Sequence, residues 1–214
     1  MSYLSLFFLE FLIIFKLSRV LLQKLFSFFF KITKNEKLSI YIIAIIFLPG
    51  TFIHEMSHFL FALFLLVKTG RLRILPQIEG KEIRLGSLEI GKTDILRRNL
   101  IGIAPMVIGI AIIVTLLYLI TQNHSNPFYV FLTAFSVFEI SNTMYSSKKD
   151  LELALPLIIL FIMLSVVLYI LKVKISINLF QILSNEKLTY LLKLADIYLG
   201  LPIFINSALA IILR

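Results

Sequence analysis

The sequence contains no cysteine in its 214 residues. Disulfide bonds and metal sites built on cysteine thiolates are therefore excluded, and cysteine usage does not indicate a redox compartment. Charged residues are also scarce, at 15% of the chain. An ordinary soluble domain is about 25% charged, so this chain has too few polar side chains to cover a surface that faces water. The scarcity argues against a soluble enzyme, a disordered tail and a nucleic-acid-binding module.

Apolar side chains make up most of what is present. They form 59% of the chain, and its mean hydropathy is +0.98. Basic residues outnumber acidic ones and give a net charge of +9. In a membrane protein, such an excess is typical of cytoplasmic loops and of contact with anionic lipid. The composition predicts an all-α polytopic membrane protein that is embedded in the lipid bilayer.

Five stretches are long and apolar enough, or nearly so, to cross the hydrocarbon, which takes about 20 residues. They are Leu38–Val67, Leu100–Ile120, Pro127–Tyr145, Leu153–Leu171 and Ala195–Leu213. The stretch from Tyr3 to Phe30 is interrupted by a stripe of polar residues, so it could be a sixth span or a basic interfacial helix. We therefore expect five to six transmembrane helices. Pro49 and Gly50, one turn before the motif described below, predict a kink in the first clear span.

The segment Arg71–Gly91 has the pattern of β-strands. Ile83 and Leu85, then Leu88 and Ile90, alternate with polar residues, and glycines separate the runs. We expect one or two short β-hairpins at the cytoplasmic surface.

Basic residues in the loops indicate the orientation. Eight of them lie between Lys68 and Arg98, whereas the loop Thr121–Asn126 has none. We therefore expect a multi-pass protein of the cell membrane with the Lys68–Arg98 segment in the cytoplasm. The lysines between 31 and 37 and those between 172 and 193 would then lie on the other side, which runs against the rule.

The first clear span contains the sequence His54-Glu55-Met56-Ser57-His58. On a helix, residues four apart share a face and lie about 6 Å apart, so both imidazoles can bind one Zn²⁺ ion. Glu55 lies beside that face, where it can act on a water molecule instead of binding the metal. Because two histidines and a glutamate are costly inside a membrane, they indicate function. The alternative is a polar patch that packs helices together.

A zinc site of this kind needs a third protein ligand and keeps a fourth position open. The candidates in or near the membrane are four acids, Glu139, Asp150, Glu152 and Asp196. Asp150 follows the span Pro127–Tyr145, which ends on the same side as the inner end of the histidine helix. Glu139 lies deeper and could bind the metal or contact a ligand, while an acid such as Asp196 more often packs helices. The residues alone leave the choice open.

Together these residues resemble the site-2 proteases, which are intramembrane zinc metalloproteases. The family carries H-E-x-x-H on a transmembrane helix and N-x-x-P-x-P-x-x-D-G two spans later. Here Asn142 and Asp150 are eight positions apart, as in that motif, although Tyr145 and Ser147 stand in place of the prolines and Leu151 in place of the glycine. The resemblance also includes a β-rich loop after the first core span.

The resemblance covers about residues 38–151. Residues 1–37 then form an N-terminal membrane or interfacial helix, 38–151 the metalloprotease core with its β-loop at about 71–91, and 152–214 the C-terminal helices. Many members of the family carry a PDZ or a CBS domain. The loop Thr121–Asn126 is too short to hold a PDZ domain, and we expect a minimal core enzyme.

The resemblance implies a set of roles. Zn²⁺ is held by His54, His58 and Asp150, Glu55 is the general base, and Asn142 contacts the substrate, which is a transmembrane protein or peptide. The hairpins offer a sheet edge to which an unwound substrate could add as a strand, or they bind only anionic lipid. Asn142 could instead cap a helix or bond two helices together.

Three other interpretations stay open. A different class of membrane zinc peptidase places H-E-x-x-H in a cytosolic domain, for which no soluble segment here is large enough. A catalytically inactive scaffold of the same fold would lack hydrolysis. A metal or ion transporter would also use intramembrane histidine and carboxylate side chains.

Overall fold

The structure, a computed structural model, describes residues 2–79, 82–123, 126–144, 159, 163 and 186–213. Most of these residues are helical. The helices are α1 (Ser2–Thr33), α2 (Glu36–Ile46), α3 (Leu48–Phe64), α4 (Ile95–Asn123), α5 (Pro127–Thr143) and α8 (Glu186–Ile212). The strands are β1 (Thr69–Arg73), β2 (Gln77–Glu79), β3 (Glu82–Arg84) and β4 (Ser87–Ile90). The prediction of a mainly helical protein with a short β segment is confirmed for the described residues.

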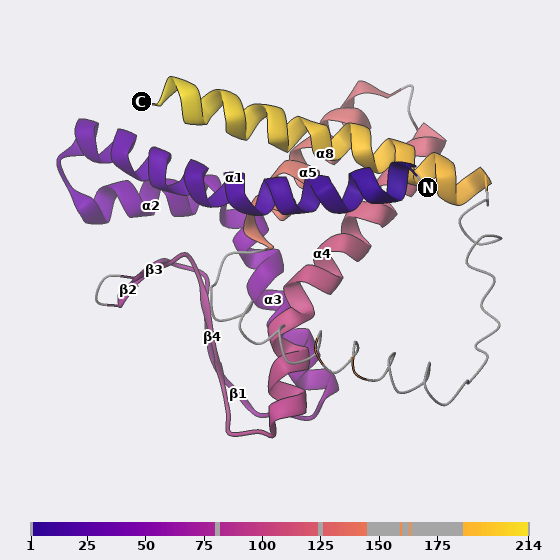
Figure 1. The fold of residues 1–214 in the computed structure, drawn as a ribbon. Coiled ribbons are helices and arrows are strands. Elements are labelled where there is room, and N and C mark those ends of the chain that lie inside the picture. The colour runs from indigo at the N-terminus through magenta and orange to yellow at the C-terminus, as the bar shows by residue number, and fades with distance from the viewer. Residues whose placement is uncertain are drawn as a thin grey trace.

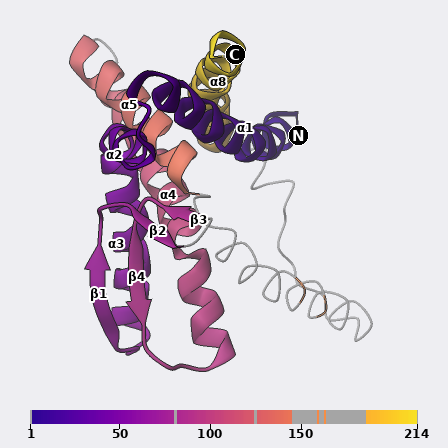
Figure 2. The same cartoon turned by 90° about the vertical axis from the view of Figure 1, so that its left-hand side faces the viewer.

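The elements form two groups at an angle to each other. In Figure 1, α1 and α8 lie side by side and run in the same direction, with α2 folded back against α1. Below them, α3 and α4 pack together, and α5 contacts α3, α4 and α8. The strands form a ribbon beside α3, which is clear when the molecule is turned (Figure 2). Helix α3 therefore packs against α4, α5 and the ribbon.

The predicted span Leu38–Val67 is not one helix. It breaks at Phe47, and α2 and α3 meet there at an angle of 78°. Pro49 has no amide hydrogen, and its ring would clash with the carbonyl four residues earlier in a continuous helix. It is tolerated in the first turn of a new helix, which is where it lies in α3. The change of direction predicted for this span is present. It lies at Phe47, before Pro49 and Gly50, and it separates two helices instead of bending one.

Within the described residues, two helices are long and apolar enough to cross a membrane. They are α4 and α8, and the bent pair α2–α3 makes a third if it counts as one span. Helix α1 is continuous but carries a stripe of charged side chains, and α5 has 17 residues. The predicted span Leu153–Leu171 lies outside the described residues, apart from two positions. The structure supports a membrane protein with two or three such helices.

Helix α4 begins at a side-chain cap. The carboxylate of Asp94 accepts a hydrogen bond from the backbone N–H of Arg97 at 2.9 Å. This bond satisfies an amide that the first helical turn leaves without an internal partner. It also lowers the pKa of the Asp94 carboxyl, because the N–H favours the charged form. The chain thus turns sharply from β4 into α4.

The predicted hairpins are present as one interrupted ribbon. Strand β1 pairs antiparallel with β4, with Leu72 opposite Leu88, and β2 pairs antiparallel with β3 farther out. The base of the ribbon is closed by the N–H of Gly91, which donates to the carbonyl of Lys68 at 2.8 Å. Leu85 and Gly86 interrupt the strands between β3 and β4. This interruption lies against the helices.

The buried apolar side chains form clusters that join the helices. The largest cluster holds residues of α1, α4, α5 and α8, including Ile14, Ile113 and Leu199. A second cluster joins α1 and α2 and also contains Leu85 from the ribbon. Burying a side chain of this size contributes about 1.5–3 kcal/mol, so Leu85 anchors the ribbon to the helical part of the molecule.

Candidate functional site

The two histidines of the motif lie one turn apart on α3. The centroids of the His54 and His58 rings are 4.9 Å apart, and the ring planes meet at 84°. Both side chains and that of Glu55 are buried, with exposed fractions of 4%, 6% and 6%. The helical spacing predicted from the sequence is therefore confirmed, and these three side chains lie inside the protein and not on its exposed surface.

One hydrogen bond determines which nitrogen of His58 faces a ligand. Its Nδ1 lies 2.7 Å from the carbonyl oxygen of Ile101 on α4. A carbonyl can only accept a hydrogen bond, so Nδ1 carries the proton, and a neutral ring then has its lone pair on Nε2. A backbone carbonyl commonly orients a metal-binding histidine in this way. The observed donors therefore fit the zinc site that the sequence predicts.

The third ligand is not identified. Within the described part of the chain, no group of three or more His, Asp and Glu side chains is arranged to hold a metal ion. Asp150, the predicted ligand, and Glu152 both lie outside the described residues. Glu139 and Asp196 are described, and neither joins the two histidines in such a group. The assignment of Asp150 therefore stays a prediction.

Glu139 has a structural partner. Its Oε2 accepts a hydrogen bond from the backbone N–H of Gly50 at 3.3 Å, between residues 89 positions apart in the chain. Gly50 lies in the first turn of α3, where backbone amides have no partner within the helix. A carboxylate there also interacts favourably with the helix dipole. In this arrangement Glu139 caps the helix that carries the histidines.

Helix α5 packs closely on α3 at Gly50. A Cβ atom added to Gly50 would lie 2.5 Å from Thr143 Oγ1 and 2.7 Å from the backbone oxygen of Glu139. Only glycine fits this contact. Because Gly50 is four residues before His54, both lie on the same face of α3. The contact places the turn of α5 that contains Asn142 next to the start of the motif helix.

Asn142 bonds α5 to α8. Its Nδ2 donates to the carbonyl of Phe138 at 2.9 Å, and its Oδ1 accepts from Asn206 Nδ2 at 2.7 Å. The interhelical hydrogen bond that the sequence left open as an alternative is thus observed. Asn206 was not a candidate from the sequence. The signal that could have identified it is a lone amide in the apolar second half of α8.

The ribbon contacts Glu55 through Gly86. A Cβ atom added to Gly86 would lie 2.7 Å from Glu55 Cγ, 2.9 Å from Glu55 Oε1 and 3.0 Å from Thr51 Cγ2. Thr51 and Glu55 are one turn apart on α3, so the Gly86 backbone lies across that face. The ribbon therefore covers the carboxylate that the motif identifies as the base. Sequence analysis marked Gly86 only as a break between strands.

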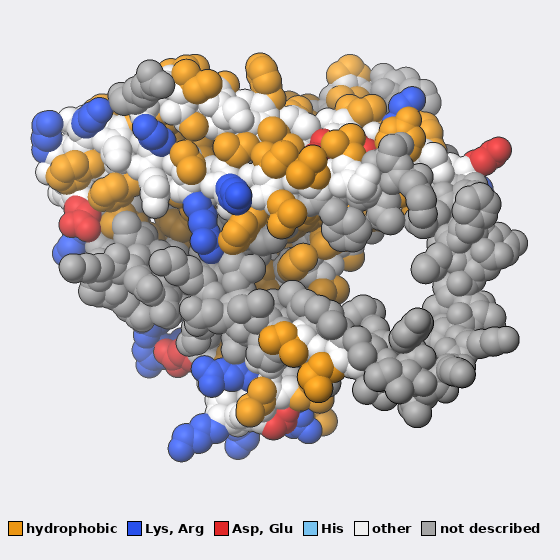
Figure 3. Space-filling view, viewed as in Figure 1, with side chains coloured by type: hydrophobic (Ala, Val, Ile, Leu, Met, Phe, Trp, Pro, Cys, Tyr) orange, Lys and Arg blue, Asp and Glu red, His pale blue; other side chains and the backbone are white. Residues whose placement is uncertain are grey.

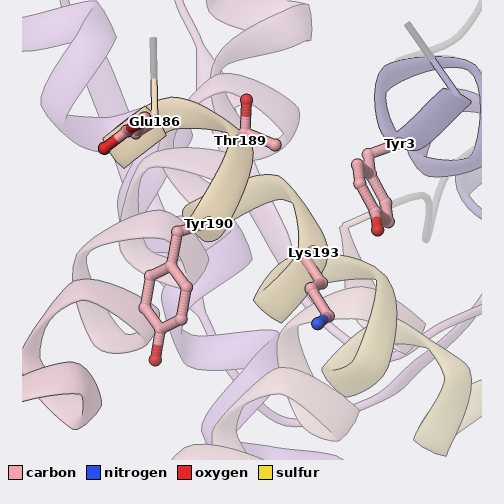
Figure 4. A pocket seen from close by; sticks show the side chains of 5 residues that line it. All are labelled: Tyr3, Glu186, Thr189, Tyr190 and Lys193. Atoms are coloured by element: carbon pink, nitrogen blue, oxygen red, sulfur yellow. The ribbon is translucent and has the colours of Figure 1, made fainter. Parts of the chain in front are cut away.

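A pocket and two groups of basic side chains lie outside the motif. A shallow pocket of about 440 Å³ lies where α1 and α8 begin, lined by Tyr3, Glu186, Thr189, Tyr190 and Lys193 (Figure 4). It contains no residue of the motif. Many of the basic side chains gather at the turn between α1 and α2 and at the end of the β1–β4 ribbon (Figure 3).

Comparisons with protein-family models, with curated proteins and with solved structures found no match to this chain.

Proposed function

We propose that this protein is an intramembrane zinc metalloprotease that hydrolyses peptide bonds in or near the transmembrane segments of other membrane proteins. The observation that carries the proposal is the orientation of His58. Its Nδ1 donates to the Ile101 carbonyl, which leaves the lone pair of a neutral ring on Nε2, on the buried side of a helix in an apolar chain. The same bond also joins α3 to α4, so the tautomer supports metal binding only together with the second imidazole, His54, one turn away.

In this proposal His54, His58 and Asp150 hold the metal. Zinc, when bound, would supply Lewis-acid activation of a water molecule and stabilise negative charge that develops on the substrate carbonyl. Glu55 takes the proton from the water and passes it to the leaving amine. Asn142 donates a hydrogen bond to the substrate backbone. The Gly86 backbone lies against Glu55 and helps to fix the position of this base.

The substrate is a transmembrane helix that has unwound locally, because hydrogen bonds within a helix shield its peptide bonds. The edge of the β1–β4 ribbon offers backbone groups to which an extended peptide can add. The ribbon leads directly to Gly86 and Glu55, which favours this route over a role in lipid binding alone. The proposed setting is a multi-pass protein of the cell membrane with five to six spans.

The proposed orientation places the Lys68–Arg98 segment in the cytoplasm. The basic side chains at the end of the ribbon would then meet the anionic inner leaflet. We place the active site nearer the cytoplasmic side because α3, which carries both histidines, leads directly into the ribbon. Water and the hydrolysed peptide would enter and leave from that side.

The decisive experiment compares the wild type with two variants in proteoliposomes. Zinc content and cleavage of a model transmembrane peptide are measured for the wild type, Glu55→Gln and Asp150→Ala. Glu55→Gln should keep zinc and lose roughly 10²–10⁴-fold in cleavage rate, because only the base is removed. Asp150→Ala should lose both. If Asp150→Ala keeps zinc and activity, Glu139 becomes the leading third ligand, and a wild type that neither binds zinc nor cleaves the peptide excludes the proposal.

A second candidate function, ion or metal transport, is favoured by two buried acids outside the motif. Glu10 on α1 and Asp196 on α8 are 8% and 7% exposed. Neither carboxylate oxygen of Asp196 has a hydrogen-bond partner among the described residues. Buried intramembrane acids are typical of ion pathways. Ion flux into liposomes that Asp196→Asn abolishes would support transport, and flux absent at every ion gradient would exclude it.

A further inference from the structure

Asn206 is a polar residue in an apolar setting. It follows Pro202 in the second half of α8, and its side chain is 0% exposed. An amide in such a place is expected to bond with another helix, since the surroundings offer it no water. Its partner is Asn142, whose proposed role is in the active site, and the two are 64 positions apart in the chain.

Two hydrogen bonds together determine how both amides are oriented. The Phe138 carbonyl can only accept, so the atom of Asn142 that contacts it must be Nδ2. Asn142 Oδ1 then faces α8, and the atom of Asn206 that contacts it must be the donor Nδ2. The amide of Asn142 is thus held from both sides.

This arrangement leaves specific groups available for a ligand. Asn142 Nδ2 has a second N–H beyond the one that bonds Phe138. Asn206 Oδ1 is buried and has no hydrogen-bond partner among the described residues, which is unusual for a native protein. Asn142 lies on α5 next to Thr143, which contacts Gly50 one turn before His54, and Asn206 reaches this turn of α5 from α8.

We propose that Asn206 is a positioning residue of the active site, and that its bond to Asn142 Oδ1 keeps the second Asn142 N–H directed to the backbone carbonyl of an extended peptide substrate. This inference rests on the proposed proteolytic function. It assigns a role to α8, which lies outside the region that resembles the site-2 proteases. Asn206 acts through Asn142 and does not itself take part in the chemistry.

The variant Asn206→Asp tests the role of the hydrogen-bond donor. When protonated, the introduced carboxyl can still donate to Asn142 Oδ1. When ionised, it only accepts, so the Asn142 amide must turn and its N–H groups face α8. We expect kcat/KM of the variant, divided by that of the wild type at the same pH, to fall at least tenfold as the pH rises through the pKa of that carboxyl. A ratio that does not change with pH overturns the proposal.

Two further variants provide controls. Asn206→Leu cannot donate at any pH, so its activity should be low throughout and its ratio to the wild type should be flat. Ser207→Ala, at the next position of α8, should match the wild type. An Asn206→Leu protein that keeps wild-type kcat/KM would also overturn the proposal.

A double-mutant cycle measured by thermal unfolding tests the contact between Asn142 and Asn206 separately from the proteolytic function. The melting temperatures of Asn142→Ala, Asn206→Leu and the double variant should show losses that do not add, because the residues touch. Non-additive losses with a flat pH ratio would make Asn206 a helix-packing residue and overturn its positioning role. If the losses are non-additive but the wild type cleaves no peptide, the contact between the two residues stands and the proposed proteolytic function is excluded. Additive losses would contradict the hydrogen bond itself.

Discussion

At Gly86 the absence of a side chain decides how closely the ribbon approaches the motif. The nearest atoms to an added Cβ would be Cγ and Oε1 of Glu55, at 2.7 and 2.9 Å. Real Cβ atoms essentially never come so close, so a larger residue here requires Glu55 or the ribbon to move. The position of Glu55, the proposed base, therefore depends on Gly86, which lies between β3 and β4.

We expect Gly86→Ala to lower kcat/KM by roughly tenfold to a hundredfold, because a displacement of about 1 Å at a catalytic group has an effect of this size. Zinc content should stay at the wild-type level, since the histidines are not contacted. The assay is cleavage of the transmembrane peptide with zinc measured on the same sample.

Gly200→Ala is the matched control for this substitution. A Cβ added to Gly200 meets nothing within 4 Å, so that variant should behave as the wild type. Full activity in Gly86→Ala would show that the ribbon does not lie on Glu55 during catalysis.

At the scale of the elements, α5 holds the start of the motif helix. Glu139 caps α3 through the Gly50 N–H, and the backbone of α5 lies against Gly50 itself. Glu139 was weighed from the sequence as a possible metal ligand or a partner of one. The hydrogen bond to the Gly50 N–H requires an acceptor oxygen, and a negative charge on that oxygen adds only the weaker interaction with the helix dipole.

Two substitutions at Glu139 distinguish these roles. Glu139→Gln keeps an acceptor oxygen for the Gly50 N–H, so its free energy of unfolding should be close to that of the wild type. Glu139→Leu leaves that amide without a partner and should lower the free energy of unfolding by about 1–3 kcal/mol. Denaturation followed by circular dichroism measures both. Zinc should remain bound in both variants, and its loss in Glu139→Gln would identify Glu139 as a ligand.

At the scale of the whole molecule, α4 connects the basic end of the ribbon to the segment before α5. It is among the helices that are long and apolar enough to cross a membrane. Lys92 lies just before α4 and Asn126 lies after it, and both are exposed. If α4 spans the bilayer, these two positions are on opposite sides.

The natural lack of cysteine makes this orientation measurable. We expect Lys92→Cys in cells to be protected from an impermeant maleimide added outside and Asn126→Cys to be labelled, because basic residues favour the cytoplasmic side. The cysteine-free wild type is the control and should take no label. Equal labelling of both variants would contradict a spanning α4.

Metal binding also has a consequence for the whole fold. A ligand that binds only the folded state stabilises it, by about 2.7 kcal/mol at a free concentration 100 times its Kd. Removing zinc with a strong chelator should therefore lower the melting temperature of the wild type by several degrees. His58→Ala should show no such shift, because it cannot form the site. Equal shifts in the two proteins would mean that the chelator acts elsewhere.

Much of the fold could be predicted because it depends on local periodicity. A repeat of four places His54 and His58 on one helical face, and alternation in residues 71–91 gives strands. The break of α2 from α3 was only partly predicted, because Pro49 prevents a continuous helix but does not set the angle. That angle depends on what packs against each half.

The sequence by itself determined the apolar helical character of the chain, the ribbon and the spacing of the two histidines, because each follows from neighbours within a few positions. Only the tertiary structure decided that Glu139 caps α3, that Gly86 covers Glu55 and that Asn206 holds Asn142. The bonds from Glu139 and Asn206 join residues 89 and 64 positions apart. Such contacts depend on how whole helices pack, and no local pattern encodes the packing.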